Sequence, residues 1–289
     1  MTDHSAGHIA QVLDNVDYLV AHDAFEGEGD RPSFSAADAY TLCLAILFHD
    51  AGMVYGRENH ESSVAKVYDL VRTATHEAPL QEKGLVYRIA LAHTGTTNAG
   101  SKDTIAAVPE SMDLDGERVH ARELAAILRF ADELAEGPQR TSNLLGQPPF
   151  SLDPDSTVYH RYASISNVHI DRQLGRIALT YRFDIGHKKL DPNQSYFRDL
   201  LEFTFSRAEK VDSERRYTRF YSQQLEPFNR TDVVLNFWHK MGLILDLGPL
   251  ELSAKTALDR HPSPLQAIDP RFDADRIIDQ LRRTATGQA

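Results

Sequence analysis

The chain has 289 residues, ordinary apolar (42%) and charged (25%) fractions, and a formal net charge of -11. This length fits one large domain or a domain with a smaller module. The excess of carboxylates disfavours a surface built mainly to bind nucleic-acid backbones, although it leaves room for a local basic cleft.

The N-terminal sequence has no basic region followed by an apolar core, and we find no apolar run near the roughly 20 residues of a membrane helix. We therefore expect a cytoplasmic protein without a membrane segment. The single cysteine, Cys43, lies in the apolar run LCLAILF. It is expected to pack as a small hydrophobe.

The first half of the chain is predicted to be helical, because apolar residues recur at helical spacing. The predicted helices span about residues 6–23, 35–48, 59–76, 81–94 and 119–136. The second is apolar on nearly all sides, which is typical of a helix at the centre of a core. Gly137 and Pro138 end the last one.

The pattern changes after about residue 156. Residues 158–170 and 176–185 alternate apolar and polar side chains and are predicted to form two strands of a hairpin. Further elements are expected as a polar helix at 194–224, a strand at 231–239 and a short helix at 274–283. The chain is therefore predicted to be mainly α, with a helical domain (1–150), a smaller α+β module (151–247) and a tail (248–289).

Two adjacent ionisable residues, His49 and Asp50, end the most apolar predicted helix. Burial of an ionised carboxylate without a partner costs several kcal/mol of desolvation free energy. A bound metal ion would remove that cost. Alone, the pair could equally be a polar cap at a helix end.

Three further positions repeat this placement beside an apolar stripe. His93 lies four residues after Ile89, Asp132 lies four after Leu128, and His8 precedes Val12 by four. Each has a simpler explanation: a core histidine can be hydrogen-bonded, and Asp132 could pair with Arg129. Their recurrence favours a shared metal site.

The order of these motifs carries a family resemblance. H-x-x-x-V at His8, LFHDAG at residues 47–52, His60, His93 and AILRFADEL ending near Asp132 together resemble the HD-domain metal-dependent phosphohydrolase superfamily over about residues 4–140. HDAGMVYGRENHE, LAHTG and the following hairpin look most similar to HD domains of ATPase-coupled bacterial conflict systems. The resemblance implies an HD-type helical bundle, and it suggests a homo-oligomer or a conflict-system protein as partner.

The resemblance also implies a ligand set. His8, His49, Asp50 and Asp132 would hold one metal ion, and Asp50 would bridge to a second. His60 and His93 match the positions of the second ion, although in triphosphohydrolase-like members a histidine near His60 helps catalysis instead. Met53 stands where many HD phosphodiesterases have lysine, and His4 is a rival to His8 that lacks the H-x-x-x-V setting.

The ligand types favour particular metals. Imidazole-rich sites suit Mn, Fe, Ni, Co or Zn better than Mg, which prefers oxygen ligands. One or two such ions would lower the pKa of a bound water and stabilise an in-line displacement at phosphorus.

Other charged residues near this set are candidates for catalysis or substrate binding. The predicted catalytic residues are Asp50, Arg57, His60 and Glu61, with His60 and Glu61 as candidates for leaving-group protonation. The alternative is that Asn59 caps a helix there and Glu61 complements its dipole. The predicted phosphate-binding residues are Arg57, Lys66, Arg129 and Arg140, each of which could instead be a solvated charge.

Three functions follow from these patterns. The first is hydrolysis of a small nucleotide, either a nucleoside or deoxynucleoside triphosphate or a cyclic nucleotide. The second is a nuclease on single-stranded DNA or RNA, for which the basic and aromatic stretch at 215–224 is the candidate contact, unless it is simply an amphipathic helix face. The third is a non-catalytic interaction module with a structural metal.

Overall fold

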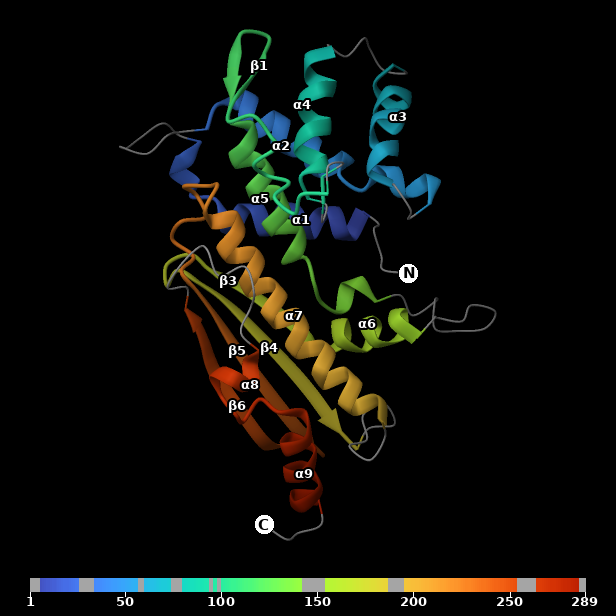
Figure 1. The fold of residues 1–289 in the computed structure, drawn as a ribbon, viewed down its shortest axis with the longest axis vertical. Helices are drawn as coiled ribbons and strands as arrows, with labels where there is room; N and C mark the ends of the chain where they lie inside the picture. Colours follow the sequence, from blue (N-terminus) through green and yellow to red (C-terminus); the bar gives the residue numbers. More distant parts are fainter. Residues whose placement is uncertain are drawn as a thin grey trace. The chain divides into compact units, whose positions relative to one another are not determined.

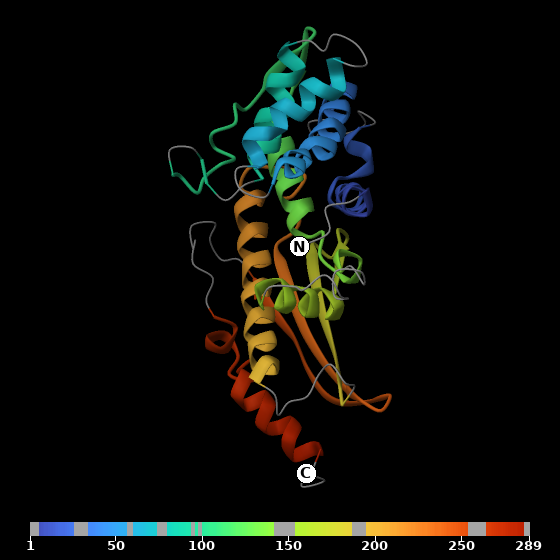
Figure 2. The same cartoon turned by 90° about the vertical axis from the view of Figure 1, so that its right-hand side faces the viewer.

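The computed structural model describes residues 6–25, 34–56, 60–73, 80–93, 96–97, 100–141, 154–186, 195–253 and 264–285. The chain divides into two compact units (Figures 1 and 2). The helical unit comprises residues 9–135 and 217–227, and the sheet unit comprises the remaining segments. The predicted fold class, mainly α with a smaller α+β module, is confirmed. The unit limits do not coincide with the predicted domain limits at residues 150 and 247.

The helical unit is built on α2, which packs against α3, α4 and α5 (Figure 1). Its elements in chain order are α1 (Ala6–Leu19), η1 (His22–Ala24), α2 (Ala36–Phe48), η2 (Ala51–Tyr55), α3 (His60–Thr73), α4 (Leu80–Leu91), β1 (Met112–Leu114), β2 (Glu117–Val119) and α5 (Ala121–Glu133). All five predicted helices are present, with ends that differ by a few residues. The limit between the two units crosses α1 just after His8. Because α1 is continuous across it, His8 is carried by the first turn of that helix.

A capping box fixes the start of α2. The Ser35 hydroxyl accepts from the Asp38 amide at 3.1 Å, and the Asp38 carboxylate accepts from the Ser35 amide at 2.8 Å. Downstream, Ala45 and Ile46 are completely buried, as expected of a core helix. Cys43 is exposed, so the expectation that it packs in the core is wrong. Its position on the helix places it on the side turned away from the core.

The expectation that no apolar run approaches the length of a membrane helix is also too strong. Residues Ala36–Tyr55 have the length and apolarity of a membrane span, and half of the apolar window is buried inside the structure. The core helix of a soluble protein meets the same criteria. Moreover, α2 itself has 13 residues, which gives a length of about 20 Å, whereas a bilayer core is about 30 Å thick.

A short hairpin between α4 and α5 was not predicted. β1 and β2 pair antiparallel, with Leu114 opposite Glu117 across a two-residue loop. Asp115 and Gly116 form this loop with φ angles of 52° and 87°. Positive φ at both positions defines the type I′ turn, for which Asp-Gly is a strong sequence signal. Asp115-Gly116 is therefore the sequence signal for this hairpin.

The sheet unit contains a four-stranded sheet and its covering helices. Its elements are η3 (Pro138–Arg140), α6 (Pro154–Ile165), β3 (Ser166–Asp171), β4 (Arg176–Ile185), α7 (Ser195–Arg219, which ends in the helical unit), β5 (Arg230–His239), β6 (Gly242–Ser253), α8 (Leu265–Ile268) and α9 (Ala274–Ala285). The strand order is β3-β4-β5-β6. β4 and β5 pair in parallel, while the two outer pairs are antiparallel.

The parallel pairing explains the long helix between these strands. Parallel neighbours need a crossover connection, and α7 supplies it while running alongside the sheet (Figures 1 and 2). Phe183 of β4 stacks on Phe237 of β5 with ring centroids 4.7 Å apart. The ring of Phe197 in α7 packs edge to face on Phe183, with ring centroids 6.0 Å apart. These rings form part of the core under α7.

Two sequence predictions about this unit need correction. Residues 158–165, predicted as strand, belong to helix α6, and only Ser166–Asp171 forms the first strand of the hairpin. β6 was not predicted, and it continues through residue 247, where the second module was expected to end. The predicted helix at 274–283 corresponds to α9.

Candidate metal centre

His49 and Asp50 follow the last residue of α2 and point into the helical unit. His49 is completely buried, and the Asp50 side chain is only 9% exposed. The His49 Nδ1 donates to the Ile46 carbonyl at 2.8 Å, because a carbonyl oxygen can only accept. This bond fixes the ring orientation and directs the other nitrogen, Nε2, away from the helix.

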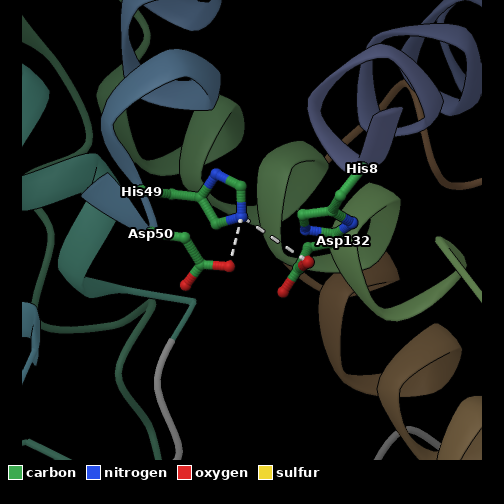
Figure 3. A group of neighbouring side chains, drawn as sticks. All are labelled: His8, His49, Asp50 and Asp132. Carbon is green, nitrogen blue, oxygen red and sulfur yellow. Dashed lines mark ion pairs between the residues drawn. The ribbon is translucent and has the colours of Figure 1, made fainter. Parts of the chain in front are cut away.

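Two carboxylates face that nitrogen, as Figure 3 shows. The His49 Nε2 lies 3.3 Å from Asp50 Oδ2 and 3.6 Å from Asp132 Oδ1. Asp132 lies in the last turn of α5, whose apolar face is buried and carries Leu124 and Leu128. Its side chain is 24% exposed, so the Asp132 edge of the cluster is the more accessible one.

The two carboxylates change the titration of His49. Burial acts to lower the pKa of this imidazole, but hydrogen bonds and charge from Asp132 and Asp50 outweigh it and raise the pKa to about 10. In the metal-free protein, a proton on His49 therefore partly balances the two acids. The cluster favours positive charge.

His8, in the first turn of α1, completes a group of four. One ligand atom from each of His8, His49, Asp50 and Asp132 lies within 4.8 Å of all the others (Figure 3). His8 is 3% exposed. Its Nδ1 accepts from Nη1 of the buried Arg140 at 2.8 Å. Because the guanidinium can only donate, this contact occupies the Nδ1 lone pair, and a neutral His8 ring carries its proton on Nε2, so a metal ion would have to displace either the Arg140 contact or that proton.

This group fits a divalent metal ion. It offers two imidazole and two carboxylate donors, from α1, from the two residues that follow α2, and from α5. Ligand atoms about 2.1 Å from one ion lie about 3.0–3.5 Å apart. The separations of 3.3 and 3.6 Å around His49 Nε2 are close to that spacing.

His93 approaches Asp50 from its other side. The His93 Nε2 lies 3.5 Å from Asp50 Oδ1, whereas His49 faces Oδ2. The two imidazole rings meet edge to face with centroids 5.1 Å apart. The His93 Nδ1 donates to the Ala90 carbonyl, which fixes this ring as the Ile46 carbonyl fixes His49. Asp50 is thus the shared neighbour of two oriented imidazoles.

The remaining predicted site residues have separate outcomes. Arg57 and the side chains of His60 and Glu61 lie outside the described residues. Lys66 is exposed, with Nζ 6.0 Å from the centroid of the Tyr55 ring. Arg129 binds the Ala92 carbonyl and the Thr104 hydroxyl. The contact between Arg140 and His8 was not foreseen, since a helix-end histidine and an arginine 132 positions away share no sequence signal.

A family model described as HD-CE matches residues 1–202. The chain belongs to the HD-CE family. This HD-domain-related family confirms the resemblance to HD domains, and the matched region contains all four residues of the buried cluster. No curated protein and no solved structure matches the chain. Membership in HD-CE, together with a His/Asp cluster able to bind a divalent metal, is consistent with an HD-type metal-dependent hydrolase.

The raised pKa of His49 would make binding of a metal ion to the cluster of this HD-CE protein dependent on pH. At neutral pH a metal ion must displace the His49 proton. We expect uptake to release about one proton, and affinity to rise about tenfold per pH unit between about pH 6 and 8. The same proton stabilises the metal-free fold below about pH 6.5, and this contribution is lost as the pH rises through about 10.

Calorimetric titration with Mn²⁺ in buffers of different ionisation enthalpy measures this proton release. In the Asp132→Asn protein one acid next to His49 is missing, so the pKa of His49 falls and fewer protons are released. An affinity that stays constant from pH 6 to 8 in the unaltered protein would contradict the expectation.

Proposed function

We propose that this protein is a metal-dependent phosphohydrolase that cleaves a phosphate ester or anhydride bond of a small nucleotide. One observation carries the proposal: Asp50 lies between two oriented imidazoles, with His49 at one carboxylate oxygen and His93 at the other. This arrangement supports a bridging carboxylate between two metal positions.

In this proposal His8, His49 and Asp132 hold the first ion together with Asp50. His93 contributes to the second position, and His60 is a predicted further ligand there. The imidazole donors favour Mn, Fe, Ni, Co or Zn over Mg. When bound, the metal would supply a water that is nucleophilic at neutral pH and would polarise a phosphoryl oxygen.

The chain's own residues prepare this chemistry before any ligand binds. The carbonyls of Ile46 and Ala90 hold the two imidazoles in fixed tautomers with Nε2 directed toward Asp50. The partial exposure of Asp132 leaves one side open to a substrate. Arg57 and Lys66 remain the predicted partners of substrate phosphates.

A small nucleotide is favoured over nucleic acid because part of the candidate nucleic-acid surface is engaged within the protein. In the basic and aromatic stretch at 215–224, Tyr217 and Tyr221 both donate to Asp103. Ser222 donates to the Glu123 carboxylate at 2.9 Å. Arg129 also covers the Tyr217 ring, which leaves the exposed Phe220 as the open aromatic ring among the described residues of this stretch.

A substrate screen in Mn²⁺ tests the proposal. Deoxynucleoside and nucleoside triphosphates, cyclic dinucleotides and short oligonucleotides are compared as substrates for the unaltered protein and for the double variant His49→Ala/Asp50→Ala. We expect hydrolysis of one small nucleotide class by the unaltered protein and none by the double variant.

The chain offers a matched control in a second His–Asp pair. The His120 Nδ1 lies 3.0 Å from Asp38 Oδ2, outside the cluster. The His120→Gln protein should keep its activity. Equal activity in the double variant and the unaltered protein would contradict the proposed site. Cleavage confined to oligonucleotides would favour a nuclease instead, and a folded protein that binds metal yet cleaves nothing would favour an interaction module. The predicted links to conflict systems and to the cytoplasm stay predictions.

A further inference from the structure

The segment after α7 belongs to the helical unit although it comes late in the chain. Residues 217–227 are grouped with residues 9–135. Tyr217 and Tyr221 each donate to the Asp103 carboxylate, with three O–O distances of 2.8–2.9 Å. The Tyr217 hydroxyl also accepts from the Ile105 amide at 3.0 Å. The Tyr217 hydroxyl thus makes two hydrogen bonds to the loop at residues 103–105, one donated to Asp103 and one accepted from Ile105.

Within this loop, Thr104 bonds to the end of α4. Thr104 is buried, and its hydroxyl donates to the Ala92 carbonyl at 2.7 Å. Arg129 of α5 donates from Nη1 to the same carbonyl at 3.2 Å and to the Thr104 hydroxyl at 2.7 Å. The Arg129 guanidinium in turn lies 4.8 Å from the centroid of the Tyr217 ring. Arg129, Thr104 and Tyr217 therefore form one connected group.

The atom on which this group converges is next to a proposed ligand. Ala92 immediately follows α4 and precedes His93, and carbonyls at a helix end lack intrahelical partners. Two donors on the Ala92 carbonyl fix the peptide that joins it to His93. The His93 ring is bonded to the Ala90 carbonyl in the same turn. The position of the ring against Asp50 therefore depends on a turn that Thr104 and Arg129 hold.

We propose that Arg129 and Thr104, supported by Tyr217, are positioning residues that hold His93 against Asp50. This inference rests on the proposed function, in which His93 serves the second metal position. It assigns Arg129 to support of a ligand, in place of the substrate contact predicted from the sequence. It also adds a contribution from a segment that lies beyond the family-matched residues 1–202.

The first readout is the ring signal of His93 in the metal-free protein. We would record ¹H–¹³C NMR spectra of histidine-labelled protein and assign the His93 signal with a His93→Gln variant. The spectra of Arg129→Met and Thr104→Val are then compared with that of the unaltered chain. We expect the His93 signal to shift or broaden in both variants while the His49 signal stays in place. Thr104→Ser keeps the hydroxyl and should restore the original His93 signal.

The second readout is metal affinity. In Mn²⁺ titrations, Arg129→Met and Tyr217→Leu should weaken the second ion by about 10–100-fold and leave the first within about twofold. Arg122→Met is the matched control, because Arg122 also lies on α5 and donates to a loop carbonyl, that of Val108, at 2.8 Å. It should change neither the His93 signal nor either affinity.

The outcomes separate this inference from the proposed function. If the unaltered protein binds a single ion, the two-ion centre is wrong, and the His93 signal still decides the positioning role. A His93 signal unchanged in Arg129→Met and Thr104→Val overturns the inference. Equal changes at His93 and His49, or equal changes in Arg122→Met, show general loosening of the unit and overturn it as well.

Discussion

Under the proposed two-ion centre, we expect the Asp50→Asn protein to stay folded and to lose both metal ions. The two carboxylate oxygens of Asp50 face different imidazoles, at 3.3 Å from His49 and 3.5 Å from His93. The amide keeps the size of the side chain but offers a neutral and weaker ligand. Metal affinity should fall by at least about 100-fold, and hydrolysis by about 1000-fold or more, because the nucleophile depends on the metal.

Metal content after dialysis, measured by mass spectrometry, and far-UV circular dichroism test this expectation together. The His93→Gln protein is the informative comparison, since it should lose one ion and keep the other. If Asp50→Asn unfolds the chain, the metal has a structural role. If it binds metal as tightly as the unaltered protein, Asp50 is not a ligand.

The largest loss of stability is expected from Arg215→Met in the sheet unit. Arg215 is completely buried and donates to Asp212 at 2.7 Å, to the Thr231 hydroxyl at 3.0 Å and to the Phe228 carbonyl at 3.0 Å. It also reaches the Leu252 carbonyl at 3.3 Å. Methionine fills the space but leaves these acceptors buried without this donor. Removal of one partner from a buried ion pair typically costs about 3–5 kcal/mol of unfolding free energy.

Urea unfolding followed by circular dichroism measures this loss. Arg198→Met is the matched control on the same helix, because the ion pairs of Arg198 with Glu202 and Asp275 are half exposed. Solvent screens such pairs, so the unfolding midpoint should barely move. Similar midpoints for Arg215→Met and the unaltered protein would show that the buried network adds no net stability.

The candidate metal ligands were predictable from the sequence because of where they lie on helices. His49, Asp50 and Asp132 each interrupt or end an apolar stripe, and a buried ionisable group on a core helix needs a compensating partner. Helical periodicity places each of these residues on the buried face of its own helix, independently of the other residues. The structure brings His8, His49, Asp50 and Asp132 together as this reasoning required.

The supporting contacts were not predictable in this way. Arg129 binds a backbone carbonyl at Ala92 and packs on Tyr217, and neither partner has a periodic relation to Arg129 in the sequence. Every residue has a backbone carbonyl, so the sequence does not indicate which carbonyl will accept a hydrogen bond from a side chain. The aromatic residues near 217 resembled a nucleic-acid surface for the same reason, since Asp103 is over a hundred residues away.

Errors in secondary structure have local causes. The segment 158–165 is rich in valine, tyrosine and isoleucine, which favour strands, yet it forms the end of α6. β6 contains Gly248 and Pro249, which argue against a central strand. It lies at the edge of the sheet beside β5, where a proline costs no bond to a further strand.

The inclusion of residues 217–227 in the helical unit constrains the order in which the chain can fold during synthesis. The bonds that Tyr217, Tyr221 and Ser222 make to Asp103 and Glu123 form only after those residues leave the ribosome. At ordinary elongation rates, residues 217–222 are synthesised on the order of ten seconds after Ala135. Until then, Asp103 and Glu123 lack these partners. A nascent chain stalled near residue 202 would hold an incomplete helical unit and a β4 strand without its parallel neighbour, an edge that invites aggregation.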